Sequence, residues 1–82
     1  MTITENQKQP INHTTFLELV NANVIRRVST INDGKWSLLI QVGSAERILH
    51  TKRNAVRKFS SLNTVENYLR SVGVQRFEVE LV

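Results

Sequence analysis

The side chains that could perform chemistry in this sequence are few and widely spaced. The two histidines, His13 and His50, lie far apart, and neither has a second ligand-type residue at helical or strand spacing. Metal sites need several converging ligands, so we predict no metal. The chain has no cysteine, which excludes thiolate ligands and disulfides and suits a reducing compartment.

The carboxylates and serines offer no catalytic arrangement either. Glu46, Glu78 and Glu80 lie near predicted strands, and alternation turns the last two toward water, whereas acid–base chemistry needs a sheltered group. Ser60-Ser61 fits a helix cap better than a nucleophile, because no base accompanies it. The three glycines are too far apart to form a phosphate-binding loop. We therefore expect no enzyme activity and no cofactor.

Cationic side chains remain, and a short connector concentrates four of them: Lys52, Arg53, Arg57 and Lys58. The whole chain has 11 Lys and Arg against 7 Asp and Glu, which gives a net charge of +4 and is compatible with a polyanionic partner. The connector precedes a predicted helix, whose first N–H groups could face a phosphate backbone together with these charges. We predict that it binds nucleic acid. The alternative is a solvated loop whose charges only oppose aggregation.

Arg26 and Arg27 form a second basic pair. Period-two alternation sends them to opposite faces of a strand, so at most one would lie on any single binding surface. If Val24 and Val28 pack inward, Arg26 points toward the core, which a bulge or an open sheet face would relieve. The five aromatic residues fall mostly on core-facing positions, which argues against a stacking platform for single-stranded nucleic acid.

The middle of the chain predicts three antiparallel strands in meander order. Val24–Ile31 is rich in β-branched residues and leads through Asp33-Gly34, a strong hairpin signal, into Trp36–Val42. Alternate residues of that second strand, beginning at its tryptophan, form the predicted buried face. A turn at Gly43 leads to a third strand, Glu46–Thr51.

Two helices and a last strand complete the expected elements. Thr15 and Glu18 have the spacing of a capping box before a short helix over residues 16–21. Apolar residues at three- and four-residue spacing predict a second helix over 60–72, with Ser60, Ser61 or a box at Asn63 as its start. Val74–Val82 alternates as a strand. Three of its apolar residues are predicted to face inward: Phe77, Val79 and Leu81.

The expected fold class is α+β, with the order α-β-β-β-α-β and an antiparallel meander sheet packed on one face by helices. Residues 1–10 are expected to be a flexible arm, and residues 11–82 one small domain. Because such a sheet has exposed edges, we also expect a homodimer. No apolar run approaches a membrane span, so we expect a cytoplasmic protein without membrane contact.

Several segments of the chain carry a likeness to a known family: Thr15–Val20, Gly34–Ser37, Arg57–Leu62, Tyr68-Leu69 and Gly73–Val79. Together they resemble the small ParC-like, partition-associated proteins of bacterial plasmids. The resemblance implies a cytosolic protein of a partition or maintenance system without enzyme activity. Three antiparallel strands, a basic segment and a helix also look like the arm-type DNA-binding domains of phage integrases. The extra first helix and last strand depart from that pattern.

The sequence therefore predicts a non-enzymatic accessory protein of a plasmid or other mobile element, which binds DNA or a DNA-bound partition protein. The alternative is a small protein-interaction adaptor or inhibitor of phage or plasmid origin, with no direct nucleic-acid contact. Under that alternative the working surface is the strand from Phe77 to Leu81 or the first hairpin, and the connector is incidental.

Overall fold

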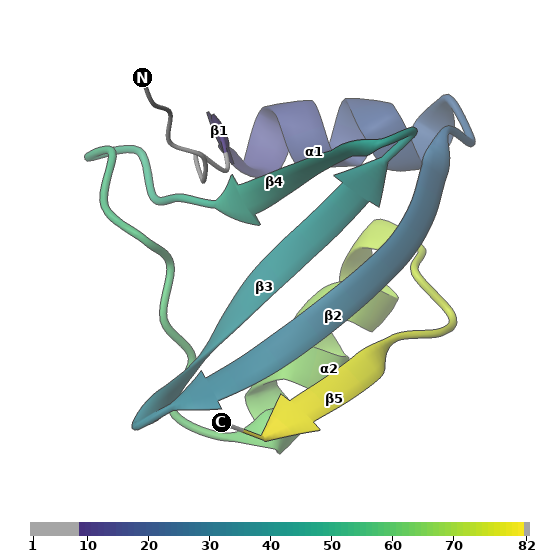
Figure 1. Ribbon diagram of the computed structural model, residues 1–82. Coiled ribbons are helices and arrows are strands. Elements are labelled where there is room, and N and C mark those ends of the chain that lie inside the picture. Colours follow the sequence, from purple (N-terminus) through teal and green to yellow (C-terminus); the bar gives the residue numbers. More distant parts are fainter. Residues whose placement is uncertain (1–8, 82) are drawn as a thin grey trace.

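Residues 9–81 are described by a computed structural model, in which two helices lie on one side of a five-stranded sheet (Figure 1). The elements in chain order are β1 (Gln9–Ile11), α1 (His13–Asn21), β2 (Ile25–Asp33), β3 (Lys35–Val42), β4 (Ala45–Leu49), α2 (Leu62–Val72) and β5 (Glu78–Leu81). The α+β class is confirmed.

The sheet is mixed, and the expectation of a purely antiparallel meander is wrong. Its strand order is β1-β4-β3-β2-β5. The three central strands pair antiparallel as predicted, but β1 runs parallel to β4 and β5 runs parallel to β2. Two short outer strands therefore flank the meander. Of the predicted N-terminal arm, residues 1–8 lie outside the described part of the chain, and Gln9 and Pro10 belong to β1.

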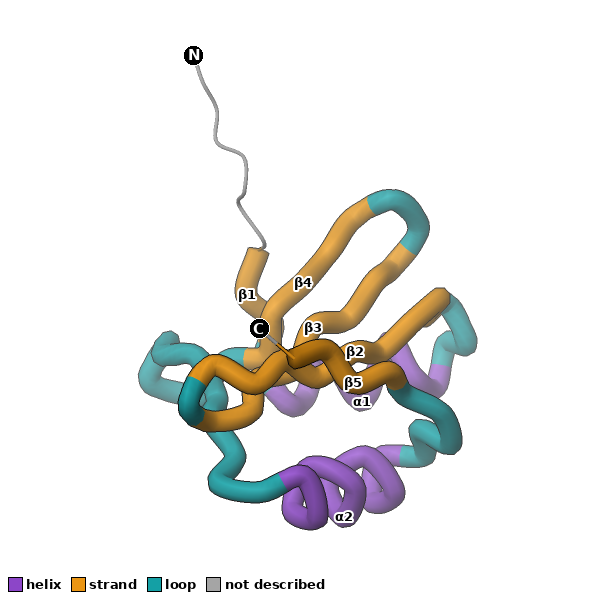
Figure 2. The backbone as a smooth tube through the Cα atoms, turned by 60° about the horizontal axis from the view of Figure 1, so that its bottom comes forward, coloured by secondary structure: helices purple, strands orange, loops and turns teal. Residues whose placement is uncertain are grey.

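The core lies between the sheet and the two helices, which cover the same face (Figure 2). Leu38 and Ile40 of β3 are fully buried there, as the alternation of that strand predicts. The core consists of nine residues: Phe16, Val28, Leu38, Ile40, Leu49, Phe59, Val65, Leu69 and Val72. Removing this apolar surface from water supplies the main driving force for folding.

The starts of the two helices are set by side-chain caps. In α1 the cap is Asn12, whose Oδ1 accepts a hydrogen bond from the backbone N–H of Thr15 at 2.9 Å. The predicted capping box with Thr15 as the cap is therefore wrong, because Asn12, a residue type that caps well, starts the helix about one turn earlier. In α2 the cap is Ser61, one of the predicted alternatives, and its Oγ accepts from the N–H of Thr64 at 3.2 Å.

Strand β5 departs from its predicted alternation. Phe77, just before the strand, packs against the core as expected. Val79 and Leu81 are instead 45% and 79% exposed, so the prediction that they face inward is wrong. The physical reason is position: β5 is the outermost strand beyond β2, and its last residues reach the edge of the molecule.

Candidate nucleic-acid interface

The basic connector leaves β4 and forms a closed turn. The backbone N–H of Thr51 donates to the carbonyl of Ala55 at 2.7 Å, and that of Asn54 donates to the carbonyl of Thr51 at 3.0 Å. Asn54 has a left-handed backbone with φ of 67°, and an antiparallel bridge joins His50 to Val56. Asn adopts this conformation at low steric cost. The turn is therefore a defined hydrogen-bonded feature, which protrudes from the end of the sheet (Figure 1).

The connector then returns to the sheet before α2 begins. Phe59 and Trp36 exchange two backbone hydrogen bonds of 2.8 and 2.9 Å, which pair the connector with the start of β3. Between turn and bridge, Arg57 and Lys58 occupy an irregular segment. Lys58 is exposed, whereas Arg57 is half-buried.

The structure therefore divides the four predicted phosphate-contacting residues. Lys52 and Arg53 are neighbours in the turn, and both are exposed. The backbone N–H of Arg53 donates to Oγ1 of Thr51 at 3.2 Å, which supports that turn. Lys58 is exposed further along the connector, and Arg57 alone is engaged with other side chains.

Arg57 lies over two aromatic rings. Its guanidinium carbon is 4.9 Å from the ring centre of Phe59 and 5.5 Å from that of Tyr68. Cations are attracted to the faces of aromatic rings at such distances. Tyr68 also shares a hydrogen bond of 2.8 Å between its hydroxyl and Nδ1 of His13, so the group joins the connector to both helices. Burial raises the pKa of Tyr68, and the positive charge of Arg57 opposes that shift.

The histidines and carboxylates form no metal centre within residues 9–81, where no group of three or more ligand-type side chains gathers. His13 is engaged with Tyr68. Nδ1 of His50 is buried and has no hydrogen-bond partner among the described residues. In the same part of the chain, neither helix has the length and apolar character needed to cross a membrane.

A second cationic surface lies at the opposite end of the molecule from the connector, where the segment 73–77 passes the start of β2 (Figure 1). Here Arg26, Arg27 and Arg76 line a shallow hollow of about 700 Å³, which we call the arginine hollow. The expectation that at most one residue of the Arg26-Arg27 pair lies on any single surface assumed an unbroken alternation along this strand. The register shifts between Ile25 and Arg27, and this bulge breaks the strict alternation.

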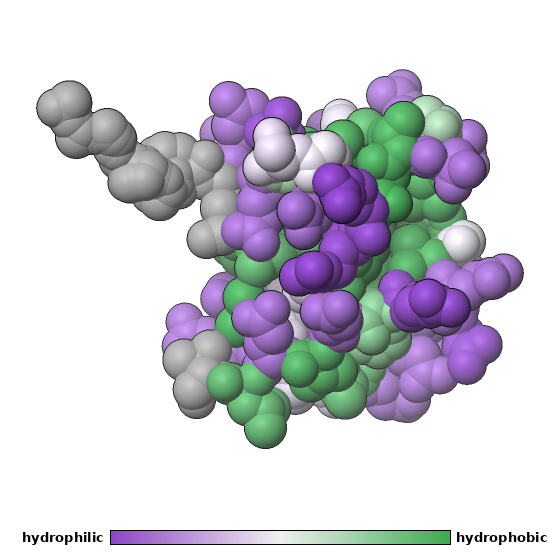
Figure 3. All heavy atoms as spheres, turned by 45° about the vertical axis from the view of Figure 1, so that its right-hand side comes forward, coloured by the Kyte–Doolittle hydropathy of each residue, from purple (hydrophilic) through white to green (hydrophobic). Residues whose placement is uncertain are grey.

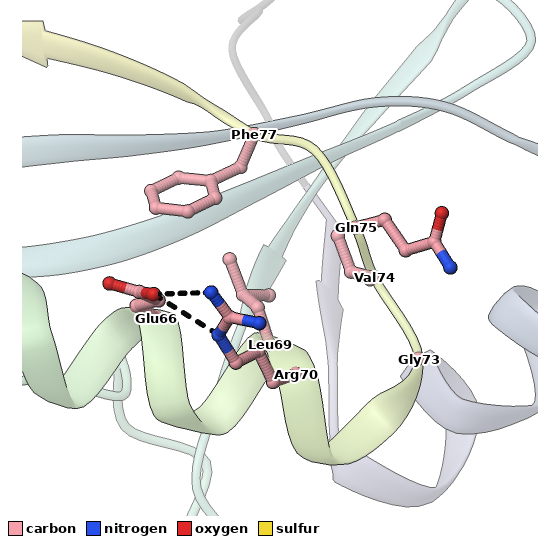
Figure 4. A pocket seen from close by; sticks show the side chains of 7 residues that line it. All are labelled: Glu66, Leu69, Arg70, Gly73, Val74, Gln75 and Phe77. Atoms are coloured by element: carbon pink, nitrogen blue, oxygen red, sulfur yellow. Dashed lines mark hydrogen bonds and ion pairs between the residues drawn. The ribbon is translucent and has the colours of Figure 1, made fainter.

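A smaller pocket of about 360 Å³ adjoins the arginine hollow between α2 and the segment 73–77 (Figure 4). Figure 4 shows its charged side chains paired: Nε and Nη2 of Arg70 donate to Oε2 of Glu66 at 3.1 and 2.8 Å. Because its cation is matched by a carboxylate on the same helix, this pocket has little net charge to offer an anion.

Sequence reasoning missed the arginine hollow because its residues come from distant segments. One signal was present: an arginine at a core-side position requires a bulge, and bulges redirect neighbouring side chains. Arg76 carried no comparable signal, since its approach to β2 depends on the parallel pairing of β5.

No family model matches this chain, and no curated protein is significantly similar to it.

Proposed function

We propose that this protein is a non-enzymatic DNA-binding accessory protein, in which exposed connector cations contact the phosphate backbone. The observation that supports this best is the closed turn, which presents Lys52 and Arg53 together in water. Lys58 adds a third exposed cation, and the segment 50–61 contains no carboxylate. Preformed cationic sites need less ordering when they bind a polyanion.

Arg57 has a different part in this proposal. Its guanidinium is stacked on Phe59 and Tyr68, so it holds the connector against the helical layer. The three exposed cations then make the phosphate contacts.

The cellular setting in the proposal is the maintenance of a plasmid or other mobile element, in the cytoplasm, with a partition protein as a further partner. This part rests on the sequence resemblance described above. A gene for a ParA-type ATPase immediately upstream would support it, and an isolated prophage gene would favour the interaction module considered below.

The test of DNA binding is its salt dependence, measured by fluorescence anisotropy on a random duplex. Each lost phosphate contact lowers the slope of log affinity against log salt by about 0.9. The variant Lys52→Ala/Arg53→Ala should therefore lose about 1.8 units of slope, and adding Lys58→Ala about 0.9 more. A charge-matched control, Lys35→Ala/Arg70→Ala, should keep the parent slope. Equal losses in both double variants would show that only net charge matters and would overturn the assignment.

A protein-interaction module is the second candidate, favoured by the apolar edge of the sheet. Val79 and Leu81 of β5 are exposed on the outermost strand, and such edges are often covered by a partner or a second copy. Sedimentation velocity over a range of concentrations tests this. A dimer that is lost in Leu81→Lys, together with no duplex binding at low salt, would favour the module over the DNA-binding proposal.

A further inference from the structure

We propose that the arginine hollow is a phosphate-binding site, separate from the connector. Its distinguishing feature is that three arginines from two segments of the chain line one hollow: Arg26 and Arg27 from β2, and Arg76 from the segment before β5. All three residues are exposed. Guanidinium groups present planar pairs of N–H donors, which match the oxygens of a phosphate group.

The two adjacent arginines that line the hollow lie at a bulge in β2. Ile25 pairs with Val42 and Arg27 with Gln41, which leaves Arg26 as the extra residue of β2. An unpaired residue in a strand costs ladder hydrogen bonds, and bulges are common next to binding sites because they change where side chains point.

The charge of the hollow is not matched by nearby carboxylates. Its lining includes one acidic residue, Glu78, whose Oε2 lies 3.7 Å from Nε of Arg27 in a long, exposed ion pair. Such pairs contribute little and are easily exchanged. Within residues 9–81, Arg26 and Arg76 have no ion pair. The residues that line the hollow therefore carry more positive than negative charge, which favours the binding of an anion.

The lining of the hollow also includes apolar residues, which could contact an organic group attached to the phosphate. Val28 is buried there, and Val20, Val74 and Phe77 are half-buried. Figure 3 brings this side forward and shows strongly hydrophilic side chains beside hydrophobic surface. A hollow of about 700 Å³ has the size of a small-molecule site. The ligand class is therefore a phosphate ester, either free or within a nucleic-acid backbone.

The two sources have different consequences. A free phosphate ester would make the hollow a ligand site that is independent of DNA binding. A nucleic-acid phosphate would give the molecule a second contact, opposite the connector (Figure 1). This second case rests on the proposed function, whereas the first does not.

The experiment is a ¹H–¹⁵N correlation titration of the full chain, first with glycerol 3-phosphate and then with a short random duplex, at constant ionic strength. We expect glycerol 3-phosphate to shift amide signals of residues 23–28 and 73–78 in a saturable manner. The variant Arg26→Ala/Arg76→Ala should bind at least about tenfold more weakly, since it removes two groups that can donate charge-assisted hydrogen bonds to the phosphate. The control Arg70→Ala, in the adjacent pocket, should bind like the parent. If Arg26→Ala disturbs the bulge, Arg76→Ala alone serves in the same comparison.

The duplex titration distinguishes the sources. Shifts in residues 23–28 and 73–78 that glycerol 3-phosphate competes away would identify a backbone phosphate, and shifts with the small ester alone would identify a free ligand. The connector signals, residues 52–58, report on the proposed function separately. The proposal of a phosphate site is wrong if neither probe shifts the amide signals of residues 23–28 and 73–78. It is also wrong if Arg26→Ala/Arg76→Ala retains the affinity of the parent.

Discussion

Replacing Arg57 by alanine should destabilise the protein, whereas the same change at its neighbour Lys58 should leave stability almost unchanged. The two residues belong to the same connector and have the same charge. They differ in contact, because the guanidinium of Arg57 lies over the rings of Phe59 and Tyr68 and Lys58 is exposed.

The magnitude follows from these contacts. A cation over an aromatic ring contributes about 0.5–1 kcal/mol at sites near the surface, and Arg57 contacts two rings. Its half-buried aliphatic stem adds packing that alanine also removes. We therefore expect a loss of about 1.5 kcal/mol in the free energy of unfolding. For a domain of this size, that corresponds to a fall in Tm of roughly 6–12 °C.

The assay is thermal and urea unfolding followed by circular dichroism, combined with duplex binding well below the Tm. Lys58→Ala should change stability by less than about 0.5 kcal/mol. Arg57→Lys should recover only part of the loss, because an ammonium cannot stack as a plane. The reasoning is refuted if Arg57→Ala is as stable as Lys58→Ala and loses a full unit of salt slope. Arg57 would then be a phosphate contact and not a packing residue.

Three further predictions concern local features of the fold. Tyr68 is the one tyrosine in the chain, and its pKa is raised in the folded state. Its contribution to the free energy of unfolding should therefore be fully present below about pH 10 and fall as the pH rises through the folded pKa. Ultraviolet difference spectra follow the ionisation, and denaturation at several pH values follows the stability. Ser61→Ala should lower the free energy of unfolding by about 1 kcal/mol in urea denaturation, because it removes the cap of α2. Gly73→Ala should cost about 1–2 kcal/mol in the same assay, because Gly73 has φ of 95°.

Each of these predictions has a matched control. In Tyr68→Phe the free energy of unfolding should no longer show the additional fall at alkaline pH. If its dependence on pH is the same as in the parent, the prediction for Tyr68 is wrong. Ser60→Ala, next to the cap, should be close to neutral; equal effects at both serines would contradict the second. An added Cβ at Gly73 would meet Cγ1 of Val20 at 3.6 Å, an ordinary contact, so the cost lies in the backbone. Gly73→Asn should therefore be milder than Gly73→Ala, and the reverse order would contradict the third.

The parts of the fold that sequence predicts well are those with a local signal. The hairpins formed at the Asp33-Gly34 and Gly43 turns, and the spacing of Val65, Leu69 and Val72 in α2, lie within short windows of the chain. Hydrophobic alternation and turn residues determine such elements directly.

The outer strands could not be predicted in the same way. Gln9–Ile11 has three residues, includes a proline and gains its strand character only by pairing with β4, almost 40 positions later. β5 pairs with β2, which is distant in the sequence, and this pairing places β5 at the edge of the sheet. Alternation within β5 carries no information about that position, so it did not indicate that Val79 and Leu81 would be exposed. The connector charges were visible in the sequence, but the stacking of Arg57 depends on Tyr68, in a separate helix.

Both edges of the sheet are formed by the first and last described segments, and this arrangement has a consequence for local opening. β1 and β5 contribute three and four residues, and each has only one neighbouring strand. The three central strands are consecutive in the chain, and β3 is paired on both sides, with β2 and with β4. Amide hydrogens of the outer strands should therefore exchange with solvent through brief detachment of one strand, while those of β3 exchange only when the whole domain unfolds. A transiently detached β5 would uncover β2, whose unpaired backbone groups could then accept a strand from another molecule.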